Sequence, residues 1–312
     1  MKLLRLWPEH SKFRFMRWRH FTFPLSALLS LVIVGLFFTH GLNFGIDFRG
    51  GTMIEMQAKN GDADAASVRE QANALGFGEV EVQAFGDQGE LSLRFPIQEE
   101  GGEQAQSAVV QKARDTFGAA YEFRRVETVG PRVSGELVQA GTVGVVISLI
   151  CVLAYLWFRF ERNLAMGALI GTLHDVLLTC GFFIITQLEF NMTSIAAILT
   201  IVGYSLNETV VVFDRTRELL RRYKSMPDVE LLDLSINTTM SRTAITFMTT
   251  FLSLLALVLF GGEAIRGFAI VMLIGIVICT YSAIFVSSPS LIYLGLRQTA
   301  AQPAASAAAA RP

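Results

Sequence analysis

The sequence predicts a polytopic α-helical membrane protein: a six-helix transmembrane bundle with one α+β domain outside the membrane. Hydrophobic residues make up 52% of the 312 residues and charged residues only 17%, which is too apolar for an ordinary soluble domain. Apolar runs of at least about 18 residues recur, and each is long enough to cross a bilayer. One long polar segment separates the first run from the others.

The first 20 residues are basic, and an apolar run follows them at 21–40. The region contains one acid, Glu9, and six basic side chains, namely Lys2, Arg5, Lys12, Arg14, Arg17 and Arg19. A cleaved signal peptide is the alternative, but the run is too long for one and no small-x-small cleavage site follows it. Because positive residues stay on the cytoplasmic side, we expect an uncleaved first span with a cytoplasmic N-terminus.

Residues 41–136 are predicted to form the separate domain. A first strand is expected at 52–58, apolar residues alternate with polar ones in 80–84 and 91–95, and a last strand is expected from Tyr121. Helical spacing occurs in 65–75 and 109–117, and a Gly-Asp-Gln-Gly turn at 86–89 separates the second and third strands. The order βαββαβ is that of the split βαβ, or ferredoxin-like, pattern.

Five further spans are expected in the second half of the chain, entered through a turn containing Gly130, Pro131 and Gly135. They cover approximately 137–157, 164–187, 192–213, 243–260 and 267–295. Six spans return the C-terminus to the cytoplasm, and the Arg-rich loops agree with this orientation. The domain at 41–136 is therefore expected on the periplasmic face, and the Ala- and Pro-rich tail at 297–312 is expected to be disordered.

Polar residues inside the apolar spans indicate a functional site. Asp175 is expected near mid-membrane and Glu208 nearer the cytoplasm, and an acid at a helix centre costs on the order of 2.5–3.5 kcal/mol on insertion scales. Arg242 begins the fifth span at a depth similar to that of Glu208. We interpret Glu208 and Asp175 as proton-carrying groups, Arg242 as their counter-charge, and Asn207 as part of the relay. The alternative is a static ion pair that holds the helices together.

Other classes of activity find no support in the sequence. There is no G-x-x-x-x-G-K-[ST] nucleotide motif, no Ser/His/Asp arrangement and no basic nucleic-acid patch. The three cysteines lie inside apolar spans and predict neither a disulfide nor a metal site. We therefore expect a protein that is not an enzyme, binds no cofactor and draws on an ion gradient.

Several motifs resemble those of the SecD/SecF family, membrane subunits of the bacterial Sec protein-export system. The resemblance runs from about residue 10 to 295 and is carried by the segments GIDFRGG (45–51), VGPRVSGEL (129–137), HD (174–175), GYSLNETVVVFDR (203–215) and SRT (241–243). It implies a bundle of the resistance-nodulation-division type in the inner membrane, with a ferredoxin-like periplasmic domain. It also implies pairing with SecD and association with the SecYEG channel and YajC.

The resemblance further implies that the protein uses the proton gradient to promote translocation and release of unfolded secreted polypeptides. The family's acid in the fourth span falls on Glu208, where many relatives have Asp, and its arginine in the fifth span falls on Arg242. Asp47 would lie at the outer, periplasmic surface of the inner membrane. The glycines at 50–51 and the segment with Gly130, Pro131 and Gly135 are candidate hinges, or simply turns.

Two other functions stay open at this point. The chain is alternatively half of a small-molecule or lipid exporter of the same superfamily, whose members usually have twelve spans and two external domains in one chain. It is otherwise a passive scaffold in which Glu208 is structural.

Overall fold

The computed structural model describes residues 11–61, 63–84, 89–98 and 102–297. The expected basic residues of 1–10, most of the turn at 86–89 and the tail from 298 lie outside these residues. The chain divides into two compact units. One contains the described residues of 1–43, 145–188 and 193–312, and the other contains 44–144 together with 189–192.

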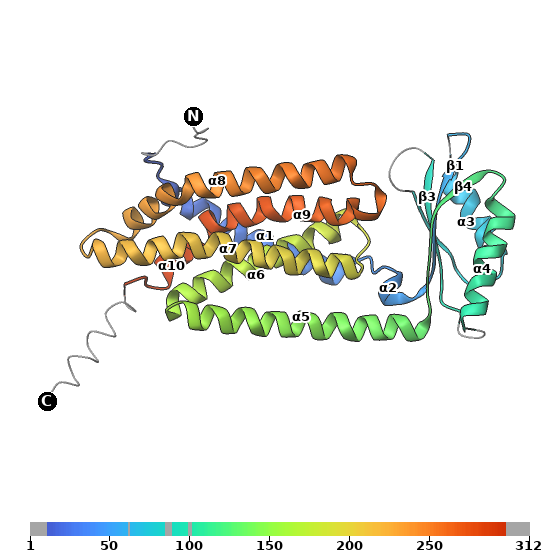
Figure 1. Cartoon of the computed structure of the whole chain (residues 1–312), viewed down its shortest axis with the longest axis horizontal. Helices are drawn as coiled ribbons and strands as arrows, with labels where there is room; N and C mark the ends of the chain where they lie inside the picture. The colour runs from blue at the N-terminus through green and yellow to red at the C-terminus, as the bar shows by residue number, and fades with distance from the viewer. Residues whose placement is uncertain (1–10, 62, 85–88, 99–101, 298–312) are drawn as a thin grey trace. The chain divides into compact units, whose positions relative to one another are not determined.

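The first unit is a helical bundle (Figure 1). Six helical segments of the described chain are long and apolar enough to cross a membrane. The helices of the first unit are α1 (Arg19–His40), the second half of α5 (Pro131–Arg159), α6 (Arg162–Thr186), α7 (Met192–Arg222), α8 (Asp228–Phe260), α9 (Glu263–Ser282) and α10 (Ser288–Tyr293).

Helices α7 and α8 extend beyond the spans expected from hydropathy. Helix α7 continues to Arg222 rather than ending at 213, and α8 begins at Asp228 rather than at 243. The reason is an amphipathic stretch in α8 in which Leu231, Leu232 and Ile236 are buried, because helical spacing places them on one face. These side chains join the same apolar core as Phe213 of α7.

The last expected span, 267–295, is interrupted. A π-helical segment, Ala283–Ser287, separates α9 from α10. Pro289 follows this segment and lacks the N–H that would continue the ladder of α-helical hydrogen bonds, and single-turn π segments commonly occur at such points. The Ser288 hydroxyl donates to the Ala283 carbonyl at 2.7 Å and so satisfies an acceptor within the interruption.

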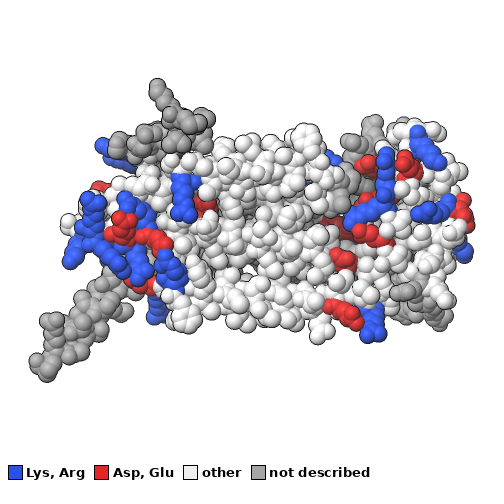
Figure 2. Space-filling model, in the orientation of Figure 1, with Lys and Arg blue, Asp and Glu red and all other residues white. Residues whose placement is uncertain are grey.

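Burial is uneven across the bundle. Half of the most apolar window of α6 is buried, but only 6% of that of α5 is. Phe158 of α5 is 88% exposed and Phe260 of α8 is 84% exposed. Figure 2 shows the bundle surface as largely uncharged, with Lys and Arg gathered toward one end. Such a surface is suited to lipid or to another membrane protein.

The second unit is an antiparallel sheet with two helices against one face. Its strands are β1 (Gly51–Ala58), β2 (Glu81–Ala84), β3 (Glu90–Phe95) and β4 (Tyr121–Val129), in the order β2-β3-β1-β4. Helices α3 (Ala65–Ala74) and α4 (Gly102–Phe117) contribute Val68, Val109 and Phe117 to a core shared with strands β1 and β3. The order of these elements along the chain is the expected one.

A four-residue helix, α2 (Ile46–Arg49), leads into β1, and α5 leaves the sheet unit. Pro131 is the first residue of α5, a position where its missing N–H costs nothing. Gly135 lies inside this helix, so the expectation that it belongs to the turn is wrong. Gly50 and Gly51 have φ values of 71° and 111°, and such angles are open to glycine at little cost.

Substituting Gly181 is expected to destabilise the bundle. A Cβ on Gly181 of α6 would approach Ile33 of α1 at 2.5 Å, and overpacking of this kind costs about 1–3 kcal/mol. Gly181→Ala should therefore lower the thermal midpoint of the purified chain in detergent. Gly35→Ala is the matched control, because nothing lies within 4 Å of a Cβ at that position. Equal midpoints for the two variants would contradict this account of α1–α6 packing.

Candidate functional site

Glu208 is buried at the packing interface of α7 and α8. Its residue is 3% exposed, and Thr246 of α8 donates a hydrogen bond to Glu208 Oε1 at 2.9 Å. The Thr246 hydroxyl also lies 3.1 Å from the Arg242 carbonyl of its own helix. A carboxylate removed from water needs such donors, because an unsatisfied buried charge is costly.

Asp175 of α6 is the centre of a second polar cluster. It is fully buried, and Ser205 of α7 donates to Asp175 Oδ2 at 2.5 Å. His174 Nδ1 lies 3.1 Å from Asp175 Oδ1, while His174 Nε2 is buried with no hydrogen-bond partner among the described residues. The cluster therefore contains two groups that are able to exchange a proton, the carboxyl and the imidazole.

Helix α7 is common to both clusters. Ser205 and Glu208 are three residues apart, so they lie on neighbouring positions of one helix face. Both are buried. The arrangement places one acid at each of the two interfaces of α7, with Asp175 on the α6 side and Glu208 on the α8 side. Asp175 and Glu208 are two of the four predicted relay residues, and each has a hydrogen-bond donor on a neighbouring helix.

Arg242 and Asn207 are arranged differently. Both are exposed in the isolated chain, and no ion pair between Arg242 and Glu208 is present within the described residues. They belong to an uncovered polar stripe on α7 and α8, which we define as the exposed residues Thr200, Gly203, Asn207, Arg242, Thr249 and Ser253. Lipid does not solvate a guanidinium or a carboxamide, so Arg242 and Asn207 require a partner or a water-filled cavity.

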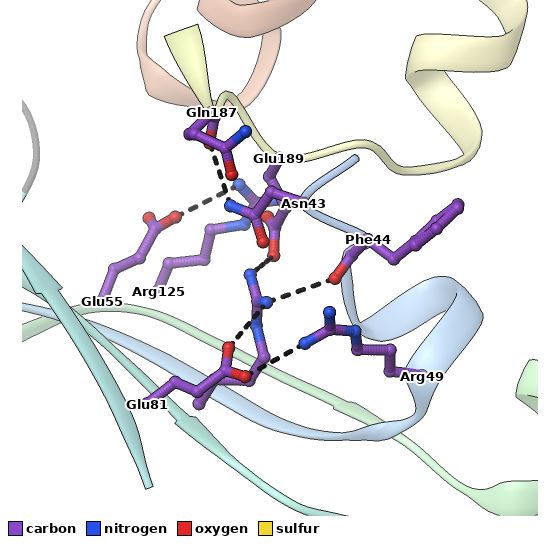
Figure 3. A network of polar contacts seen from close by, with 9 residues as sticks. Asn43, Phe44, Arg49, Glu55, Glu81, Arg125, Gln187 and Glu189 are labelled. Atoms are coloured by element: carbon purple, nitrogen blue, oxygen red, sulfur yellow. Dashed lines mark hydrogen bonds and ion pairs between the residues drawn. The ribbon is translucent and has the colours of Figure 1, made fainter. Parts of the chain in front are cut away.

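A third polar cluster, which the sequence did not single out, lies in the sheet unit: Phe44, Glu81 and Glu189, labelled in Figure 3, each accept a hydrogen bond from Arg94. Arg94 Nη2 donates to Glu189 Oε1 at 2.6 Å, and Nη1 donates to the Phe44 carbonyl and to Glu81 Oε2, each at 3.2 Å. Arg49 reaches the other oxygen of Glu81 at 3.0 Å. The sequence signal for this cluster was an arginine at a polar position of an alternating strand. Such an arginine is ordinary for an exposed sheet face, so it did not indicate a cluster.

Asp47 lies at the edge of this third cluster. The backbone N–H of Met192, the first residue of α7, donates to Asp47 Oδ2 at 2.9 Å. Gly50 and Gly51, the neighbouring hinge candidates, are closely packed: a Cβ on Gly50 would meet Ile97 at 2.5 Å. Nothing lies within 4 Å of a Cβ at Gly130 or Gly135. Flexing at any of these positions stays a prediction.

Two family models match the chain. The model for the C-terminal region of the protein export membrane proteins SecD/SecF matches residues 109–297, more than half of the chain. The model for the SecD/SecF GG motif matches residues 35–62, which include Asp47 and its two following glycines. The chain belongs to the SecD/SecF family. The family assignment expected from the sequence motifs is thus confirmed.

Relatives and solved structures agree with this membership. The chain is 43% identical to protein translocase subunit SecF of Rickettsia bellii, over 92% of this chain and 95% of that protein. It is 45% identical to protein translocase subunit SecDF of Brucella abortus over 94% of this chain, but it spans only 39% of that longer protein. The crystal structure of SecDF, a translocon-associated membrane protein, from Thermus thermophilus aligns with a TM-score of 0.82 at 32% identity, over 94% of this chain and 40% of that one.

The ion pair at Glu189 predicts a pH dependence in this SecD/SecF family member. Burial raises the pKa of the Glu189 carboxyl, and Arg94 and Arg125 oppose this while Glu127 adds to it. Because the pKa of Glu189 is raised in the folded state, this carboxyl stabilises the fold at pH values below its ordinary pKa. That stabilisation is lost as pH rises through the folded-state pKa. Backbone protection of 189–192, corrected for intrinsic exchange, should therefore fall as pH rises above the ordinary carboxyl pKa of about 4.3.

Hydrogen exchange with mass spectrometry of the full chain checks this. Glu189→Gln should remove the fall in protection, because an amide does not titrate. Glu136→Gln, which changes an exposed carboxylate of the same unit, should leave it intact. A fall of equal size in the Glu189 variant would show that another group is responsible.

Proposed function

We propose that this chain is an auxiliary subunit of the Sec translocase, coupled to the proton-motive force. In this proposal it acts with SecD in the bacterial inner membrane and promotes translocation and release of secreted proteins. The observation that carries the proposal is Glu208, a buried carboxylate with a hydroxyl donor on α8, next to the uncovered polar stripe. A proton carrier needs a carboxyl that is stable inside the membrane and a polar route to it.

The uncovered polar stripe supports a membrane partner. A guanidinium such as that of Arg242, placed on an apolar span, needs an anion and hydrogen-bond acceptors. A second six-helix subunit covering α7 and α8 would supply them and would enclose Glu208. The chain spans about 40% of the SecDF proteins it matches, which supports SecD as that subunit. The SecYEG channel and YajC are further expected partners.

The sheet unit supports the periplasmic part of the proposal. Its element order βαββαβ and its strand order β2-β3-β1-β4 are those of a ferredoxin-like domain. The arginines after α5 and at the end of α7 support a cytoplasmic position of those loops by the positive-inside rule. The unit at 44–144 then faces the periplasm, where an emerging polypeptide would meet it.

Membership of the SecD/SecF family favours this function over a small-molecule or lipid exporter. The passive scaffold differs from it in one measurable respect. Only the proton-coupled subunit requires Glu208 to change its protonation state.

Glu208→Gln should reduce export to the level measured without a proton gradient. The amide oxygen still accepts from Thr246, so the protein level and partner binding should be unchanged while the titrating group is lost. Export of a secreted protein into inverted membrane vesicles measures this, with and without the gradient. Glu218→Gln is the matched control, because Glu218 lies on the same helix but is exposed and paired with Arg215. Gradient-stimulated export at the wild-type level in the Glu208 variant would favour the scaffold.

Arg242→Met should also impair gradient-stimulated export, and Arg242→Lys should do so less because it keeps the charge. In the proposed assembly the partner covers Arg242 and supplies its anion, and truncating one member of such a buried charge pair costs about 2–5 kcal/mol, so a loss of tenfold or more is expected. The same vesicle assay measures it, and co-purification with SecD tests the interface separately. If both variants export normally, Arg242 only sets the topology of the span.

A further inference from the structure

A cavity of about 450 Å³ opens at the end of the helical bundle where α5 and α7 both finish. Its size is within the range of roughly 300–1,000 Å³ that is typical of sites for small ligands. Six residues of the bundle unit line it, namely Arg159, Asp214, Arg217, Glu218, Arg221 and Arg222. Four positive and two negative side chains give this lining a formal charge of +2. Figure 2 shows the Lys and Arg side chains gathered toward this end of the bundle.

Helical spacing brings the α7 residues of the lining together. Asp214, Arg217 and Arg221 are separated by three and four residues, so they share one face of α7. Arg159, the last residue of α5, forms an ion pair with Asp214 and so adds a second helix to the cavity wall. Two arginines four residues apart on a helix repel each other. An anion bound beside Arg217 and Arg221 would offset this repulsion.

The ion pairs of this region leave two arginines of the cavity without an acid. Three pairs take up the neighbouring carboxylates: Arg159 with Asp214, Arg217 with Glu161, and Arg215 with Glu218. Arg221 and Arg222 are exposed, and neither forms an ion pair within the described residues. The unmatched positive charge of the cavity therefore belongs to these two side chains.

The cavity adjoins an apolar helix surface that the bundle leaves uncovered. Only 6% of the most apolar window of α5 is buried. Trp157 and Phe158, which directly precede Arg159, are 67% and 88% exposed, and Tyr155 is 46% exposed one turn earlier. Because Trp and Tyr are enriched where the hydrocarbon of a membrane meets its headgroups, we infer that this end of α5 lies at headgroup level.

We propose that this cavity binds the phosphate headgroup of an anionic phospholipid, whose acyl chains lie along the exposed surface of α5. A guanidinium suits a phosphate because it donates two parallel hydrogen bonds to it, and basic pockets between transmembrane helices bind anionic headgroups. A lipid is favoured over a free anion because apolar surface for its chains begins beside the cavity. The site goes beyond the function proposed above and does not depend on proton coupling.

Trp157 can report on lipid at this site. The chain has three tryptophans, so replacing Trp7 and Trp18 by Phe leaves Trp157 as the only one. The full chain is reconstituted in mixtures of phosphatidylglycerol and phosphatidylcholine in which one of the two lipids has brominated acyl chains. Bromine quenches indole fluorescence at short range, so the quenching gives the binding constant of phosphatidylglycerol relative to phosphatidylcholine beside Trp157.

Phosphatidylglycerol should bind at least fivefold more tightly than phosphatidylcholine, because each basic residue near an anionic lipid contributes about a factor of five. Arg221→Gln combined with Arg222→Gln should bring the ratio close to one. Arg221→Lys combined with Arg222→Lys keeps both charges and should retain most of the preference. The thermal midpoint of each variant in detergent checks that it is folded, and it should be unchanged because both side chains are exposed.

Lys12→Gln combined with Arg17→Gln is the matched control. It removes the same charge from two exposed residues that do not line the cavity, so the lipid ratio should stay within about twofold of the wild-type ratio. An equal fall in the two Gln variants would overturn the site, because surface charge alone would then explain the preference. A ratio near one in the wild-type chain would also overturn it.

Inorganic phosphate distinguishes a lipid from a free anion. Added in place of sodium chloride at the same ionic strength, it should leave the lipid ratio unchanged, because it has no acyl chains to contact α5. Displacement of phosphatidylglycerol by inorganic phosphate would show that the cavity takes a free anion, and the lipid proposal would be wrong.

Discussion

A carboxylate inside an apolar bundle must be given hydrogen-bond donors, and the packing of α6, α7 and α8 depends on this requirement. Asp175 takes its donor from Ser205, and Glu208 takes one from Thr246. Each hydrogen bond joins two helices, so removing a donor would weaken both the helix contact and the site. The same bonds fix the rotation of α7, because Ser205 and Glu208 share a face that must meet α6 and α8 together.

The uncovered polar stripe is an outer face of the bundle, on α7 and α8, that carries polar side chains. Arg242 and Asn207 are exposed there, at depths where neither water nor lipid solvates them well. These two side chains therefore require a partner surface or a water-filled cavity beside α7 and α8.

Sequence patterns predicted the features that depend on local periodicity. Long apolar runs predicted the spans and alternation predicted the strands. Glu208 was identified as a candidate site residue because it is an acid within an apolar span. The early start of α8 was missed because its buried leucines lie in a stretch that is amphipathic rather than uniformly apolar. The contact between Asp47 and Met192 was missed because it joins residues 145 positions apart, and nothing in either segment alone indicates the other. The exposure of Arg242 was not predicted, since depth along a span does not fix which face a residue occupies.

The sheet unit is not continuous in sequence, and this sets an order on its synthesis. Its strands are complete at Val129, yet two residues that complete the unit are made about 60 residues later. These are Phe190, whose ring contacts Phe48, and Glu189, which forms an ion pair with Arg94. At a translation rate of roughly 5–20 residues per second, that interval is on the order of 3–12 s. During this interval α5 and α6 must enter the membrane, and the Phe190 ring is not yet present to contact Phe48. The sheet unit is thus completed only after α5 and α6 have been synthesised, so its folding cannot finish before these two helices have been made.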